Sequence, residues 1–242
     1  MKKRPRNNYF QSMFSLGKPF CFILLIFIFL CNSCNSRKDV HPEASTASES
    51  SNLRKNVPPI KQAEIRKIIQ IQPYGQFPKE LIDEVISGIK KMYKLDVKIL
   101  PVALLPDMAF YPPRNRYIAD SLLIDLNSKK TNEAFKIIGL TEKDISTDIP
   151  NWGIFGYGSV DGYTCVVSSF RLKKGVGELK VIERLIKIVN HEIGHTLGLN
   201  HCPVSLCLME DGGDSIKSVD NATGKLCAGC RKKTQNYLVK PN

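Results

Sequence analysis

Hydrophobic and polar residues alternate along the chain with two periods, and each period predicts one type of element. Residues 65–72 and 95–100 are β-prone and predict two strands. Between them, residues 79–93 repeat at a helical interval directly after Pro78. This order predicts a strand–helix–strand unit in which the helix packs on a sheet.

The same analysis predicts a helix at residues 116–126, strands at 135–140 and 163–171, and then a long helix. One stripe of the long helix is apolar: Val181, Ile182, Leu185, Ile186, Val189, Ile193 and Leu197. Its charged residues are expected to face water: Lys180, Glu183, Arg184 and Lys187. We therefore predict an α+β fold, with helices packed on a mixed, twisted β-sheet in a single domain.

Composition divides the chain into three segments. Residues 35–61 are rich in Ser, Lys, Glu, Asn and Pro and hold few large apolar side chains, so they cannot bury enough surface to fold. We expect a flexible linker there, with a solvated His41. Residues 62–242 are long enough for one domain with its own core, and residues 1–34 have the pattern of a targeting segment.

Five basic residues precede the apolar run 20–30, as in the basic and hydrophobic regions of a secretory signal peptide. The run has eleven residues, whereas a membrane-spanning helix needs about 20. Cys34 follows the small residue Ser33 and resembles the cleavage and acylation site of a bacterial lipoprotein, although the preferred leucine three residues upstream is missing. We expect an exported protein anchored to the membrane through lipidated Cys34, on the periplasmic side or the cell surface. An uncleaved, retained anchor is the alternative.

The formal net charge of +12 adds little to this picture. The expected signal peptide holds five basic and no acidic residues, which leaves +7 for the rest of the chain. A moderate positive charge favours acidic substrates or anionic surfaces. Because Lys and Arg are scattered and are not interleaved with aromatic residues, we expect no binding to nucleic acid.

Residues 191–201 read H-E-x-x-H-x-x-G-x-x-H and carry three of the four histidines of the chain. His191 and His195 are four residues apart, which places them on one helix face about 6 Å apart, close enough to bind one metal ion. Gly198 is expected to end the helix in a left-handed conformation, so that His201 returns to the ion. Three neutral nitrogens leave a fourth tetrahedral position open, which is typical of catalytic zinc.

Glu192 is expected to lie beside this ion. A carboxylate there is badly placed to be a ligand but well placed to take a proton from an activated water, which is the work of a general base. The motif therefore predicts a hydrolytic zinc site with Glu192 as its catalytic residue.

Four cysteines follow the motif as two close pairs: Cys202 with Cys207, and Cys227 with Cys230. Such a layout is typical of a structural zinc held by four thiolates. Adjacent side chains in an extended segment point in opposite directions, so His201 and Cys202 should serve different ions. Two disulfides are the alternative, and Cys165 has no evident partner.

The continuation H-C-x4-C-x-M-x17-C-x-x-C after the helix resembles the archaemetzincin family of metallopeptidases, within the metzincin clan. The resemblance implies a metzincin-like domain that hydrolyses peptide bonds. It places the three histidines on the catalytic zinc and Met209 on the methionine of the Met-turn, as a hydrophobic floor under the metal. It also places the four cysteines on a second, structural zinc, which makes two Zn²⁺ ions per chain.

The segment 151–172 also resembles the archaemetzincin stretch ahead of the zinc helix. In metzincins the strand that borders the cleft pairs antiparallel with substrate. We expect residues 162–169 to supply this edge, and a buried strand without substrate contact is the alternative.

The resulting hypothesis is a zinc metallopeptidase that acts on peptides or proteins. Two other functions stay open. One is a zinc hydrolase of a small amide, which would have a closed pocket in place of an extended cleft. The other is a lipid-anchored binding protein with little proteolytic activity, and an intact Glu192 argues against it.

Overall fold

Five strands form the main sheet of this computed structural model, which describes residues 67–148, 152–211 and 215–239. Their order is β2–β1–β5–β9–β8, and the first four strands are parallel while β8 is antiparallel to β9. The strands span the following residues: β1 Ile68–Pro73, β2 Asp96–Ile99, β5 Ala134–Thr141, β8 Gly156–Gly158 and β9 Thr164–Ser168. The sheet is therefore mixed, as predicted.

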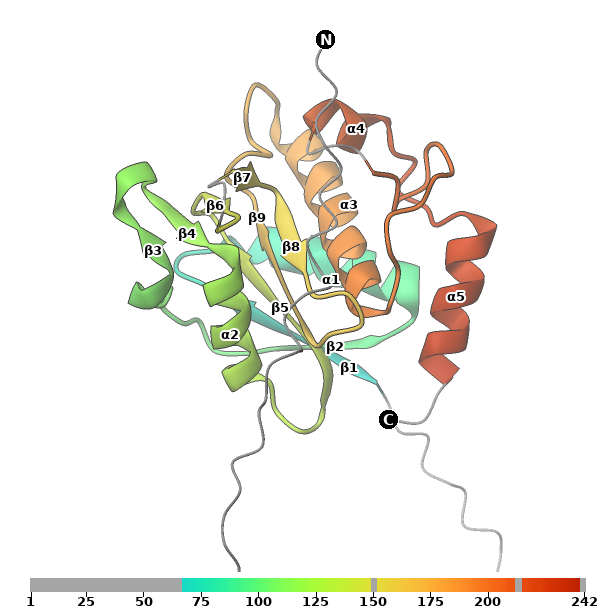
Figure 1. The fold of residues 1–242 in the computed structure, drawn as a ribbon, viewed down its shortest axis with the longest axis horizontal. Coiled ribbons are helices and arrows are strands. Elements are labelled where there is room, and N and C mark those ends of the chain that lie inside the picture. Colours follow the sequence, from blue (N-terminus) through green and yellow to red (C-terminus); the bar gives the residue numbers. More distant parts are fainter. Residues whose placement is uncertain (1–66, 149–151, 212–214, 240–242) are drawn as a thin grey trace, which may run out of the picture. The chain divides into compact units, whose positions relative to one another are not determined.

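Helices cover both faces of this sheet (Figure 1). On one face, α1 (Lys79–Tyr93) packs beside α3 (Glu178–Thr196), and on the other lies α2 (Ala119–Lys129). Alternate strand residues serve the two cores, since Ile138 packs with α1 and α3 whereas Ile137 packs with α2. The central strands are accordingly buried on both faces, and every residue of β5 and β9 is buried.

A second, smaller sheet has the order β3–β4–β6–β7. Its strands are short: β3 Phe110–Tyr111, β4 Arg116–Ile118, β6 Ile145–Ser146 and β7 Gly153–Ile154. Two 3₁₀ turns, Asp107–Ala109 and Pro112–Arg114, flank β3. The C-terminal part adds α4 (Ile216–Asn221) and α5 (Ala228–Val239).

The predicted elements recur in the structure with two differences. The helix expected at 116–126 begins only at Ala119, because residues 116–118 pair with β6 as strand β4. The edge strand expected at 162–169 was wrong: β9 lies between β5 and β8, and all five of its residues are buried. In the part of the chain that the structure describes, β8 forms the edge of the sheet next to β9, and β2 forms the opposite edge.

The signal peptide, lipidated Cys34, His41 and the linker at 35–61 lie outside the described residues. Within the described ranges, none of the helices has the length and apolarity that a membrane crossing requires.

Candidate metal centre

Helix α3 and the turn after it bring three imidazoles together. His191 and His195 lie one turn apart on α3, with ring centroids 4.7 Å apart. Gly198 has a φ of +78°, the left-handed conformation that glycine adopts at low cost, and it ends the helix as predicted. The ring of His201 then lies 5.4 Å from that of His191 and 5.0 Å from that of His195, so all three can offer a nitrogen to one ion.

Backbone carbonyls determine which nitrogen each helical imidazole offers. His191 Nδ1 lies 2.7 Å from the carbonyl oxygen of Leu208, and His195 Nδ1 lies 2.7 Å from that of Leu199. A carbonyl only accepts, so both Nδ1 atoms carry the proton and donate it. The two Nε2 atoms, 3.0 Å apart, then present their lone pairs to each other, which is the arrangement of two ligands of one cation.

Burial keeps the two helical imidazoles neutral, as metal ligands must be. Burial, with a smaller contribution from the neighbouring His191, lowers the pKa of His195 to about 4. The pKa of His191 is likewise lowered, mainly by burial. Three imidazole nitrogens that converge in a partly buried site fit zinc.

Glu192 lies against the edge strand β8. Its side chain is 7% exposed and lines the same cleft as His191 and His201. A Cβ atom added to Gly156 would lie 2.6 Å from Glu192 Cγ, and one added to Gly158 would lie 2.8 Å from the Glu192 carbonyl oxygen. The glycines of β8 therefore allow the carboxylate to sit beside the sheet edge. Sequence reasoning missed this role, and glycines inside a strand are the signal for such close approach.

Met209 lies beneath the metal centre with no exposed surface, and its sulfur packs against Gly194 of α3. The preceding residue, Leu208, provides the carbonyl that orients His191. This position suits the hydrophobic floor expected of Met209.

The four cysteines form a second cluster, whose sulfur atoms all lie within 4.8 Å of one another: Cys202, Cys207, Cys227 and Cys230. The sulfurs of Cys202 and Cys227 are 3.8 Å apart. Zn–S bonds of about 2.3 Å in a tetrahedron separate two sulfurs by about 3.8 Å, so the spacing fits a shared zinc. The five cysteines that the structure describes are all free thiols, and Cys165 lies apart in the core.

Backbone amides point at these sulfurs. The amide of Cys227 donates to Cys207 Sγ over 3.3 Å, and that of Cys230 donates to Cys227 Sγ over 3.5 Å. The second hydrogen bond is the largest of the causes that lower the pKa of Cys227 to about 7. A lowered pKa makes this thiol easier to ionise, which favours metal binding.

The two clusters are joined through the backbone. The amide of Cys202 donates to the carbonyl of Met209 over 2.7 Å, and Cys202 directly follows His201. The segment that carries His201 and Cys202 is therefore tied to the turn that orients His191.

Helix α4 forms the wall of the cleft opposite β8. Ser215, Ser218 and Val219 line it from this side, while Phe155 and Gly156 line it from the other. The open groove between them leads to the imidazoles and to Glu192.

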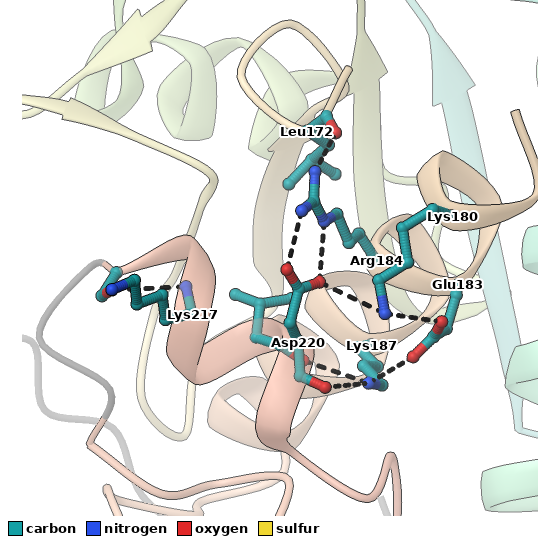
Figure 2. A network of polar contacts seen from close by, with 9 residues as sticks. Leu172, Lys180, Glu183, Arg184, Lys187, Lys217 and Asp220 are labelled. Atoms are coloured by element: carbon teal, nitrogen blue, oxygen red, sulfur yellow. Dashed lines mark hydrogen bonds and ion pairs between the residues drawn. The ribbon is translucent and has the colours of Figure 1, made fainter. Parts of the chain in front are cut away.

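Ion pairs fasten α4 to α3 (Figure 2). Arg184 donates to both carboxylate oxygens of Asp220, over 2.8 and 2.7 Å, and also to the carbonyl of Leu172 over 2.8 Å. Lys187 donates to Glu183 over 2.6 Å and to the carbonyl of Val219 over 3.1 Å.

The expectation that Arg184 and Lys187 face water was wrong. Their exposed fractions are 5% and 9%, because α4 packs over this face of α3. Asp220 and Glu183 compensate the two buried cations, as burial of charge requires. The helical periodicity of α3 does not predict that a second helix packs on its polar face.

The model of peptidase family M54 matches residues 67–236 of this chain. Archaemetzincin of Haloquadratum walsbyi is 32% identical over 173 residues, which cover 68% of this chain and 98% of the relative. Archaemetzincin of Methanopyrus kandleri is 36% identical over 136 residues, which cover 56% of this chain and 75% of the relative.

Solved structures agree with this comparison. The crystal structure of archaemetzincin from Methanopyrus kandleri superposes with a TM-score of 0.67 at 28% identity, and covers 75% of this chain and 100% of its own. Archaemetzincin from Archaeoglobus fulgidus, complexed with malonate, gives a TM-score of 0.60 at 28% identity over 69% of this chain and 99% of its own.

Substitution of one clustered cysteine should remove one metal ion and leave the other. We expect the purified Cys227→Ser variant to bind one zinc ion fewer than the unmodified chain and to melt at a lower temperature, because metal binding at the thiolates contributes to folding. Elemental analysis and thermal denaturation measure both. Cys165→Ala is the matched control and should keep the full zinc content; unchanged zinc and melting in Cys227→Ser would remove these thiols from a metal site.

Loss of the ion pair between Arg184 of α3 and Asp220 of α4 should change stability in a pH-dependent way. Hydrogen bonds from Arg184 lower the pKa of Asp220 from 3.8 to about 2, so its contribution is present above pH 4 and is lost as pH falls to 2. We expect Asp220→Asn to lower the free energy of unfolding at pH 7 by about 2 kcal/mol. In urea denaturation the difference from the unmodified chain should shrink between pH 4 and pH 2, and a constant difference would contradict the assignment.

Proposed function

This chain belongs to peptidase family M54, the archaemetzincins, and is a zinc-dependent metallopeptidase, and on that premise we propose that Glu192 is the general base of peptide hydrolysis. The observation that carries the proposal is the position of its carboxylate. It is buried at the floor of an open cleft, next to His191 and against the edge strand β8. A bound peptide and an attacking water would meet it there.

The proposed ligands of the catalytic zinc are His191, His195 and His201. When bound there, zinc supplies a Lewis acid that lowers the pKa of water and polarises the scissile carbonyl. The hydrogen bonds to the carbonyls of Leu199 and Leu208 hold two of the imidazoles in the required tautomer. We further propose that the four clustered cysteines hold a second, structural zinc.

The proton steps fall to Glu192. Its carboxylate accepts a proton from the attacking water as the oxygen forms a bond to the carbonyl carbon. The same carboxyl group then donates that proton to the leaving amine nitrogen when the C–N bond breaks. No residue is acylated, so a single acid–base group serves both halves of the reaction.

Strand β8 is the proposed platform for the substrate backbone. Among the described residues it is the edge strand of the main sheet that lies against Glu192, and an extended peptide can add to such an edge as a further strand. Antiparallel addition would lay the peptide across the cleft between β8 and α4. This open groove supports a peptide as substrate over a small amide, which would suit a closed pocket.

Removal of the base should abolish hydrolysis without loss of metal. We expect Glu192→Gln to keep its zinc content and to lower kcat by about 10²- to 10⁴-fold, the usual contribution of general-base catalysis. Quenched fluorescent peptides and elemental analysis measure the two quantities. The exposed Glu84→Gln is the matched control, and near-normal hydrolysis by Glu192→Gln would exclude Glu192 as the base.

A methyl group on β8 should misplace the base. In Gly156→Ala the new Cβ would overlap the side chain of Glu192, whose position must then change. We expect kcat to fall by about 100-fold with both metals retained, since a displacement near 1 Å has such an effect. Gly177→Ala is the control because a Cβ there meets no atom within 4 Å. Full activity in Gly156→Ala would show that the contact does not position Glu192.

A further inference from the structure

A second cavity, of about 660 Å³, adjoins the metal cleft. Phe155 lines both spaces, and α4 contributes Ile216 here and its neighbour Ser215 to the cleft. Phe170, half exposed, completes the apolar part of the wall. The cavity therefore continues the groove in which a peptide would lie, at the end of β8 where Gly156 is located.

The polar part of this cavity carries excess positive charge. Arg116, Arg171 and Lys174 line it, with Asp144 as the single acidic group in the lining. Asp144 is 8% exposed and accepts from Arg116 Nε over 2.7 Å and from Arg171 Nε and Nη2 over 2.6 and 2.8 Å. Asp144 thus pairs with both guanidinium groups. The exposed Lys174 adds a further charge, so the lining has a formal net charge of +2.

The guanidinium of Arg171 is held in place before any ligand binds. Asp144 fixes one edge of it, and its plane packs on Gly153 of β7, where an added Cβ would lie 1.9 Å from Nη2. A guanidinium fixed in this way loses little freedom when it binds a second carboxylate. The cavity thus offers a preorganised cation beside an apolar wall.

The direction of β8 determines which part of a substrate reaches this cavity. The strand runs from Gly156 to Gly158. A peptide that adds antiparallel runs the opposite way, so the residues after the cut bond pass Gly156 and continue toward Phe155. The cavity therefore faces the C-terminal side of the substrate.

We propose that this cavity is a subsite for a carboxylate on the C-terminal side of the cut bond, carried by an acidic side chain or by the free C-terminus of a short peptide. The inference rests on the proposed function, because the cut bond is placed by Glu192 and the histidines. It assigns to Arg116, Arg171 and Lys174 a preference for acidic substrates.

The test uses the zinc-loaded full chain and one short peptide that it cleaves, with the cut bond located by mass spectrometry. Versions of this peptide carry Glu, Gln or Lys at each of the positions after the cut, and end in a free or an amidated C-terminus. We expect kcat/KM to be about tenfold higher for Glu than for Gln at one position, as a charge-assisted hydrogen bond would give. Preference for the free over the amidated terminus identifies the C-terminal carboxylate as the source instead.

Two variants separate the cavity from general charge effects. Lys174→Glu should abolish the preference, so that the ratio of kcat/KM for the Glu peptide to kcat/KM for the Gln peptide falls from about ten to one or below, because a repelling charge replaces an attracting one. Lys91→Glu on α1 changes the net charge equally but lines neither space, so it should keep the preference. Equal rates for Glu, Gln and both termini would overturn the inference while peptide hydrolysis itself stands.

Binding is measured separately on Glu192→Gln by the fluorescence anisotropy of the labelled peptides. Tighter binding of the Glu or free-terminus peptide, lost in the double variant with Lys174→Glu, supports the subsite even if turnover is low. If no peptide is cleaved by the unmodified chain, the proposed function fails, and equal binding of all peptides to Glu192→Gln then overturns the subsite as well.

Discussion

Two hydrogen bonds from imidazole Nδ1 atoms to backbone carbonyls determine the character of the whole site. They point the Nε2 lone pairs of His191 and His195 at each other over 3.0 Å, an arrangement that is unfavourable unless a cation lies between them. Both carbonyls belong to the segment after α3, so the course of that segment decides whether a metal can bind. The residue after His201 helps to hold this course, because the backbone amide of Cys202 donates a hydrogen bond to the carbonyl of Met209.

The cleft depends on constraints from its two sides. Strand β8 approaches Glu192 closely because Gly156 and Gly158 carry no side chain, so that the proposed base lies beside the sheet edge. Helix α4 is short, and it keeps its place through the paired charges of Arg184 and Asp220 (Figure 2). An isolated six-residue helix is unstable in water, so the wall of the cleft needs such contacts with α3.

Positive charge is distributed unevenly over these contacts. On the α3 side, Arg184 and Lys187 are buried and compensated by Asp220 and Glu183. In the cavity beyond Phe155, Asp144 is the single acidic residue of a lining that also holds two guanidinium groups and a lysine. The ion pairs of Arg184 and Lys187 stabilise the fold, whereas Arg171 is held where the proposed carboxylate ligand would bind.

The sequence by itself determined the features that depend on neighbours along the chain. The spacing of His191, His195 and Gly198 sets helix faces and a helix end, and alternation separates His201 from Cys202, because covalent geometry and helical period act locally. Only the tertiary structure decided which strand lies at the edge beside Glu192, that Arg184 is buried, and that Gly156 lies against Glu192. These depend on contacts between segments far apart in sequence, such as α3 with α4 and α3 with β8, and no local period encodes such contacts.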